Sequence, residues 1–440
     1  MKIALITYGT RGDVQPVLSL AFALQARGHE PRLIGPINAA SWAQAAGVPF
    51  TALPVDVHAL LAKPAAQRML ARGDMRSFFK WLAYEELAYR DALREALLAG
   101  CSDADGLIGH ALMEDRAAAI ASARRIPLLP LYFFPVPPSR EFPSPFISTR
   151  NLGPLNPLTH KLLLDMLWRA SREDVALLRR QLNLAPATMS FTRLAQQQQL
   201  PCALAYSEAL LPRPRDYGPH NTITGSITVP DALRSRLGEG GLPQALRVWL
   251  ERGPPPVFLG FGSMPVLDVP RMLECARTAL RRLGLRGVIG AGWSELPAGG
   301  DDTLIAVGNV DHTALFPRCA IAVHHGGAGT TYASLRAGVP TLICSVFADQ
   351  PFWGVRCRAL GVGETFPFAR FSTERLERSL RKLLDPAVES RAKALALRLE
   401  AERSRARNRA GRARATARPA RRLNDLVTVS APAGPSMTRT

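Results

Sequence analysis

The sequence predicts an α/β protein with two Rossmann-like domains that face each other across a cleft. At 440 residues the chain exceeds one ordinary hydrophobic core, and its 47% hydrophobic and 21% charged residues are a globular composition. Two separate series of short apolar runs alternate with helical patterns, as in doubly wound parallel sheets. Glycine turns follow strands in both series, at the strand ends where open α/β sheets bind their ligands.

The first series, assigned to a domain of residues 1–215, opens with a strand, a glycine turn, a helix and a second strand, which is a βαβ unit. The alternation continues through a long amphipathic region. The expected elements are strands at Lys2–Tyr8, Pro31–Gly35, Gly106–Gly109 and Ile126–Phe134, helices at Val17–Leu24 and Ala117–Arg125, and the amphipathic region Met69–Leu98.

The segment from Phe134 to Pro157 is rich in Pro, Phe and Ser, and its lack of periodicity predicts a long structured loop. Loops of this length are usually functional or disordered. Phe133, Phe134, Phe142 and Phe146 favour an apolar lining for a ligand pocket, and ordinary anchoring of the loop is the equally supported alternative.

Pro and Gly recur in residues 216–245, which predicts the connection between the domains. The second domain then spans residues 246–402, and residues 403–440 form a basic tail that is expected to be disordered. The expected elements are strands at Val257–Phe261, Gly287–Gly290, Thr303–Val307, Ala320–Val323 and Thr341–Val346, and helices at Met272–Leu283, Thr330–Ala337, Pro351–Leu360, Thr373–Leu384 and Glu389–Glu402.

The net charge of +19 admits nucleic acid, an anionic membrane surface or an anionic substrate as partners. Part of the excess lies in the tail, where nine Arg and no acidic residue occur between Arg403 and Arg422. No nucleic-acid-binding module accompanies the charge, so we expect no nucleic-acid partner. Peripheral contact of the tail with a membrane is a hypothesis.

The six cysteines are scattered and contain no C-x-x-C pair, which is typical of a reducing compartment. No His, Cys and Asp cluster has the spacing of a metal site, so no metal is expected. The chain begins directly with a predicted strand, without a signal peptide, and no apolar run approaches the length of a membrane span. These features predict a cytoplasmic protein that is at most peripheral at the inner membrane face.

The strongest local signal is the run His324 to Thr331, between a buried strand and a helix. A glycine-rich turn at a helix N-terminus gathers unpaired N–H groups and the positive end of the helix dipole, so it favours an anion. The hydroxyls of Thr330 and Thr331 add donors, and both histidines can hydrogen-bond the same anion.

Two acidic positions lie at other strand ends. Asp13 begins the first helix beside Arg11, where it suits either a helix N-cap or a general base, and position alone favours the cap. Asp349 and Gln350 precede a helix and suit several sugar hydroxyls, with capping as the alternative. His110 is a candidate for the pocket wall, although single histidines are more often structural.

Taken together, these motifs resemble those of nucleotide-sugar-dependent glycosyltransferases of the two-Rossmann-domain (GT-B) type, closest to the branch with sterol glucosyltransferases and enzymes that glycosylate antibiotic aglycones. The opening Gly9 to Pro16 is similar to that branch's first motif. Gly262 to Pro265 and Gly292 to Ser294 resemble the sterol-type members, and His324 to Thr331 with Ala348 to Gly354 resembles the donor-site signature.

The resemblance implies roles for individual residues. Asp13 matches the catalytic base, the backbone near Val310 would hold the nucleobase, and Asp349 and Gln350 would hold the transferred sugar. His110 and the four phenylalanines would line the acceptor site. The donor diphosphate would be held by Arg11, Gly12, Ser263, His325, Gly327, Gly329 and Thr330.

The expected reaction is an inverting, metal-independent transfer of a hexose from a nucleoside diphosphate sugar, with UDP-glucose as the expected donor and no other cofactor. The acceptor would be a hydroxyl of an apolar molecule such as a sterol, hopanoid, carotenoid, other lipid or polyketide. Two alternatives stay open: a non-catalytic module that binds a nucleotide sugar, and a nucleotide-sugar epimerase on the same fold.

Overall fold

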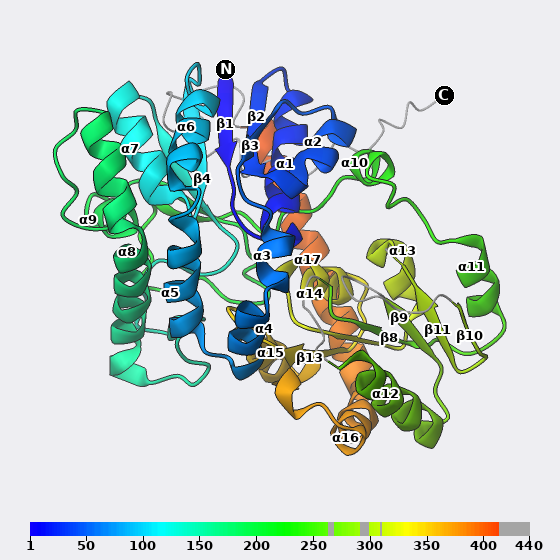
Figure 1. Cartoon of the computed structure of the whole chain (residues 1–440). Helices are drawn as coiled ribbons and strands as arrows, with labels where there is room; N and C mark the ends of the chain where they lie inside the picture. The colour runs from blue at the N-terminus through cyan, green and yellow to red at the C-terminus, as the bar shows by residue number, and fades with distance from the viewer. Residues whose placement is uncertain (263–267, 291–298, 309, 413–440) are drawn as a thin grey trace.

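The computed structural model describes residues 1–262, 268–290, 299–308 and 310–412, and it confirms two α/β domains with parallel sheets (Figure 1). The first sheet has the order β3-β2-β1-β4-β5-β6-β7, and all its strand pairs are parallel. Its strands are β1 (Lys2–Ile6), β2 (Glu30–Pro36), β3 (Phe50–Leu53), β4 (Gly106–His110), β5 (Leu128–Tyr132), β6 (Cys202–Leu204) and β7 (Asn221–Ile223).

Helices cover both faces of this sheet, which explains why its strands are near-continuous apolar runs. They are α1 (Arg11–Gln25), α2 (Ala40–Ala46), α3 (Val57–Ala62), α4 (Pro64–Arg72), α5 (Met75–Glu86), α6 (Arg90–Gly100), α7 (Glu114–Arg124), α8 (Asn156–Gln181), α9 (Phe191–Gln197) and α10 (Asp231–Arg236), with short 3-10 turns η1 (Ile37–Ala39) and η2 (Gly153–Leu155).

The second sheet has the order β10-β11-β9-β8-β12-β13-β14, and only β10 is antiparallel. Its strands are β8 (Val257–Gly260), β9 (Gly287–Gly290), β10 (Gly299–Gly300), β11 (Leu304–Val307), β12 (Ile321–His324), β13 (Thr341–Ser345) and β14 (Gly363–Pro367). Its helices are α11 (Gln244–Glu251), α12 (Val269–Leu283), α13 (His312–Leu315), α14 (Ala328–Arg336), α15 (Gln350–Ala359), α16 (Thr373–Leu383) and α17 (Pro386–Arg412), with η3 (Phe316–Arg318) and η4 (Phe368–Arg370).

The predicted domain boundaries need two corrections. The predicted connection 216–245 contains β7, which pairs with β6, and α10, whose Leu233 is buried in the first domain. The predicted tail began at Arg403, but α17 continues to Arg412. Strands β3, β6, β7, β10 and β14 were not expected, because runs of two to five residues carry too little periodicity to be recognised.

The two domains share a hydrophobic core, which fixes the geometry of the cleft between them. Tyr206 and Leu210 of the first domain are buried together with Trp353 of α15 and with Leu395 and Leu399 of α17. In Figure 1, α17 runs from the second domain up to the first. There the carboxylate of Glu402 accepts hydrogen bonds from the Ser207 hydroxyl and from the Glu208 N–H at 2.8 Å.

Among the described residues, the structure contains no helix that combines the length and the apolar character needed to cross a bilayer.

Two leucines of α17 test the contribution of this shared core. Leu399 is 4% exposed and Leu397 is 75% exposed on the same helix. We expect Leu399→Ala to lower the free energy of unfolding by about 2–4 kcal/mol, because it leaves a cavity in a packed interface. Leu397→Ala should change it by less than about 0.5 kcal/mol. Urea unfolding measures both, and equal effects of the two substitutions would show that α17 does not hold the domains together.

Candidate active site

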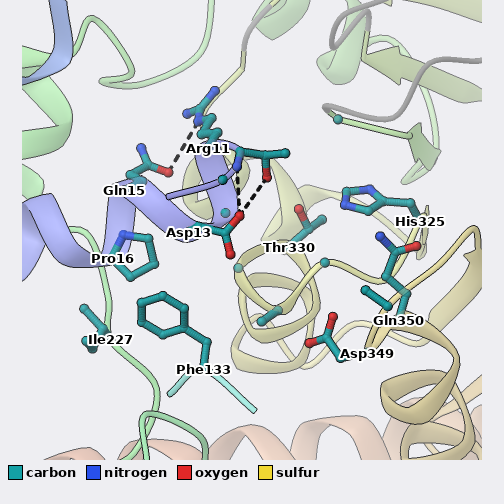
Figure 2. Close-up of a pocket in the computed structure, with 18 of the residues that line it drawn as sticks. Arg11, Asp13, Gln15, Pro16, Phe133, Ile227, His325, Thr330, Asp349 and Gln350 are labelled. Atoms are coloured by element: carbon teal, nitrogen blue, oxygen red, sulfur yellow. Dashed lines mark hydrogen bonds between the residues drawn. The ribbon is translucent and has the colours of Figure 1, made fainter. Parts of the chain in front are cut away.

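A cavity of about 670 Å³ lies between the domains, at the carboxyl ends of β1, β12 and β13. One wall is the β1–α1 turn with Asp13, and the opposite wall is the β12–α14 turn with His325 and Thr330. Figure 2 shows the carboxylate of Asp13 facing Thr330, Asp349 and Gln350 across this space. The topology therefore gathers three strand ends from two domains at one cavity.

The β1–α1 turn holds Asp13 in a defined orientation. Thr10, and not Asp13, is the N-cap of α1, and Asp13 is the third residue of the helix. The Oδ2 atom of Asp13 accepts from the Thr10 N–H at 2.8 Å. Gly9 adopts a φ of +135°, and a Cβ at this position would lie 2.2 Å from Asp13 Oδ2. Only glycine therefore lets the carboxylate fold back against the turn, and Oδ1 remains for a ligand.

The environment of Asp13 favours a base that works near neutral pH. Burial raises the pKa of Asp13 to about 6, and the hydrogen bonds from Thr10 only partly offset this. His110 Nε2 lies 3.5 Å from Asp13 Oδ1, and the His110 ring stacks on Phe133 with centroids 5.3 Å apart. Burial lowers the pKa of His110 to about 4, so the imidazole beside Asp13 is neutral at pH 7. His110 was expected near the acceptor, and the structure places it in the cavity wall against Asp13.

The β12–α14 turn has the geometry of an anion site. Gly326 adopts a φ of +94°, and a Cβ there would lie 2.5 Å from Ile343 Cγ2, so glycine is required. Helix α14 starts at Ala328, and its first N–H groups have no partner within the helix. A Cβ at Gly329 would meet no atom within 4 Å, so the backbone is open to a ligand here. Gly327, Gly329 and Thr330 all line the cavity.

The two adjacent histidines have different places. The His325 ring lines the cavity, its buried Nδ1 has no hydrogen-bond partner, and burial lowers its pKa to about 4. His324 is buried in the sheet and its Nδ1 accepts from the Gly326 N–H at 3.0 Å, so the expectation that both histidines meet the anion is wrong. Thr331 is also buried, and its hydroxyl donates to the Gly327 carbonyl at 3.0 Å.

A strained turn presents Asp349 to the same cavity. Ala348, just before it, has a φ of +58°, a conformation that costs a non-glycine residue roughly 1–2 kcal/mol. The Asp349 carboxylate accepts from Trp353 Nε1 at 2.7 Å. Burial raises the pKa of Asp349 to about 6, and the charge of Asp13 across the cavity adds to the shift.

The other donor-site candidates line the cavity with their own local partners. The Oε1 atom of Gln350 accepts from the Val346 N–H at 2.8 Å and so also holds its own turn. Arg11 forms an ion pair with Glu239, and Gln15 Nε2 donates to the same carboxylate at 3.1 Å. Gly12 and Val310 lie in the wall, whereas Ser263 lies outside the described residues.

The remaining wall of the cavity is apolar. Phe133, Phe134 and Phe146 line it as expected, but Phe142 does not. Phe142 packs in the shared core against Tyr217 and Phe352, so its assignment to the acceptor site is corrected. The sequence did not link seven further residues of the apolar wall to the site. For three of them, Phe78, Phe79 and Leu82, the amphipathic pattern of 69–98 indicated a buried face. The others are Leu60, Leu61, Leu163 and Leu167.

Within the described ranges, the structure contains no group of three or more His, Cys, Asp or Glu side chains that could hold a metal ion. Besides the N–H groups of the two turns, the described part of the cavity wall includes the side chains of Arg11, Arg234, Arg336 and Arg403.

Comparison with known proteins gives a consistent result for both domains. Residues 3–110 match the glycosyltransferase family 28 N-terminal domain, and residues 294–406 match the erythromycin biosynthesis protein CIII-like C-terminal domain. The chain is 34% identical over 410 residues to the O-mycaminosyltylonolide 6-deoxyallosyltransferase of Streptomyces fradiae, covering 90% of this chain and 93% of that protein.

A sterol 3-beta-glucosyltransferase of Arabidopsis thaliana is 33% identical over 408 residues, which are 90% of this chain. The chain spans 62% and 65% of the length of two such plant relatives. Among solved structures, the glycosyltransferase VinC in complex with dTDP has a TM-score of 0.62 at 17% identity, covering 98% of this chain and 99% of that one. This last similarity concerns the fold.

The raised pKa of Asp13 predicts a pH-dependent stability. The folded pKa of about 6 exceeds the ordinary aspartate pKa of 3.8, so ionising Asp13 destabilises the fold as pH rises through this window. We expect Asp13→Asn to leave stability unchanged near pH 3.5 and to raise it by about 1–2 kcal/mol at pH 7.5, because the Asp13 side chain is 32% exposed and keeps part of its hydration. Urea unfolding at both pH values checks this, and an equal change at both would contradict it.

Proposed function

This chain belongs to the glycosyltransferase family whose members include sterol 3-beta-glucosyltransferases and antibiotic glycosyltransferases, and we propose that it moves a hexose from a nucleoside diphosphate sugar to a hydroxyl of an apolar acceptor. One observation carries the proposal. A half-buried carboxylate, Asp13, faces a helix N-terminus beside His325, whose Nδ1 has no partner, across one cavity (Figure 2).

The anion site supports a diphosphate donor. The first N–H groups of α14, its dipole and the neutral His325 ring together suit two phosphate groups without a metal ion. Asp349 and Gln350 stand beside this site, where their oxygen and nitrogen atoms suit sugar hydroxyls. UDP-glucose is the proposed donor, since the plant relatives are glucosyltransferases by name. VinC binds dTDP, so a donor panel should include thymidine nucleotides.

The proposed reaction is a single in-line displacement. Asp13 Oδ1 takes the proton of the acceptor hydroxyl as the oxygen forms a bond to the anomeric carbon. The bond from that carbon to the diphosphate oxygen breaks on the opposite face, which inverts the anomeric configuration. The charge that grows on the leaving diphosphate is stabilised by the α14 N-terminus and by the N–H that His325 donates.

The apolar wall of the cavity supports an apolar acceptor. Phe134 and Phe146 pack with their rings tilted by 47° and their centroids 4.9 Å apart, and α3, α5 and α8 add aliphatic and aromatic side chains around Asp13. A sterol, hopanoid, carotenoid or polyketide would bury its apolar body here and present a hydroxyl to Asp13. Contact of the basic C-terminal residues with a membrane stays a prediction, since residues 413–440 lie outside the described ranges.

Replacement of Asp13 tests the base directly. We expect Asp13→Asn to lower turnover by about 10²–10⁴-fold while donor affinity stays within a factor of about three, because the amide cannot take the proton. Mass spectrometry of products from UDP-glucose and an apolar alcohol panel measures turnover. Wild-type kcat/KM should fall below about pH 6, as Asp13 becomes protonated. Full turnover in the variant would exclude this role, and donor binding without turnover by the wild type would favour a non-catalytic module.

Replacement of His325 tests the anion site. We expect His325→Ala to weaken UDP binding by about 10–100-fold, because a hydrogen bond to a charged group contributes about 1.5–3 kcal/mol. Calorimetric titration with UDP measures the affinity. The control is His58→Ala, an exposed histidine outside the cavity. Equal affinity of the His325 variant and the control would place the diphosphate elsewhere.

A further inference from the structure

The start of α8 carries an unusual set of exposed leucines. Leu152, Leu155, Leu158 and Leu162 are 41%, 56%, 59% and 54% exposed. Among the described residues, the other exposed large hydrophobic side chains occur singly or, as Tyr84 and Leu87, as one pair, whereas these four fall within eleven positions. We call them the leucine ridge. Isolated exposed leucines need no explanation, but a cluster of four large ones does.

The ridge is a regular and well-fixed surface. Leu155 is the N-cap of α8, and Leu158 and Leu162 follow it at spacings of three and four residues, so the three side chains lie on one side of the helix start. The buried side chain of Asn156 fixes the preceding turn, because it accepts from the Leu152 N–H at 2.9 Å and donates to the Arg140 carbonyl at 2.9 Å. The leucines are therefore presented to solvent by a rigid element. In Figure 1 this end of α8 lies at the outer lower edge of the first domain.

The charges around the ridge are mainly positive. Arg140, Arg150 and Lys161 are exposed next to the leucines in the same folded unit. Asp165, the acidic residue of the same helix face, forms an ion pair with Arg193 at 2.6 Å. Two further carboxylates accept from backbone N–H groups: Glu141 from Arg215 at 2.8 Å and Asp216 from Arg140 at 2.6 Å. The ridge thus combines apolar side chains with a basic surround.

We propose that the leucine ridge docks on an anionic lipid bilayer, with the leucines in the interfacial layer and the basic residues on lipid headgroups. This combination is typical of interfacial helices. A twofold contact between two copies of the chain would instead bring like charges together, which disfavours self-association.

The position of α8 connects this surface to the cavity. Leu163 and Leu167, on the side of α8 away from the ridge, line the apolar wall. A bilayer-bound chain would hold that wall close to the lipid phase, from which an apolar acceptor could enter. This link to the acceptor rests on the proposed function, whereas the docking itself does not.

Vesicle binding of the full chain tests the proposal. The probes are vesicles of phosphatidylcholine with 25% phosphatidylglycerol and vesicles of phosphatidylcholine alone, used at about 0.1 M salt. We expect the wild type to co-sediment with the anionic vesicles, and the triple variant Leu155→Gln, Leu158→Gln, Leu162→Gln to lose about tenfold or more in partition coefficient. The variant Arg150→Gln, Lys161→Gln should bind several-fold more weakly and lose its dependence on salt.

The matched control is Leu384→Gln, Leu397→Gln, which changes two exposed leucines of the second domain that are 41% and 75% exposed. It should bind like the wild type. UDP affinity and transfer to a water-soluble alcohol, both measured without lipid, should be unchanged in every variant. These two measurements test the proposed function independently of vesicle binding. Equal vesicle binding by the triple variant overturns the proposal. So does a wild-type dimer in light scattering that the triple variant converts to a monomer.

Discussion

The proposed chemistry depends on a half-buried carboxylate in the interdomain cavity, opposite the N-terminus of a helix. Asp13 is kept in place by the Thr10 N–H and by the space that Gly9 leaves. Burial makes its ionised form costly, and this cost gives a pKa suited to taking a proton from an alcohol. The shared core with α17 maintains the cavity, because it fixes both domains against each other. The ionised form of Asp13 therefore destabilises the fold, although it is the form that would take the proton.

Much of this arrangement followed from the sequence. The apolar runs and the glycine turns predicted two parallel α/β domains. Because open α/β sheets bind ligands at the carboxyl ends of their strands, Asp13, His325 and Asp349 were expected at one cleft. These predictions succeed because a strand buried on both faces is a continuous apolar run, and a turn that needs positive φ contains a glycine. Resemblance was needed to favour a base over a helix cap for Asp13, and the geometry shows that Oδ2 supports the turn while Oδ1 faces the cavity.

Features that depend on tertiary contact could not be predicted. The path of α17 to Ser207, the burial of Phe142 and the different places of His324 and His325 are set by packing between distant segments. Strand β7 was assigned to the connection because three residues are too few to show the alternation of apolar and polar residues that identifies a strand. The apolar wall from α5 was visible only as an amphipathic pattern, which indicates a buried face but not what it faces.

In the proposed reaction, Asp13 takes the proton of the attacking alcohol and the α14 N-terminus stabilises the leaving diphosphate. A crystal structure with UDP, a non-transferable sugar analogue and an apolar alcohol tests it most directly. We expect the diphosphate over the first turn of α14 and the alcohol oxygen about 2.6–3.2 Å from Asp13 Oδ1. A diphosphate bound elsewhere, or an alcohol oxygen out of reach of Asp13, would contradict it.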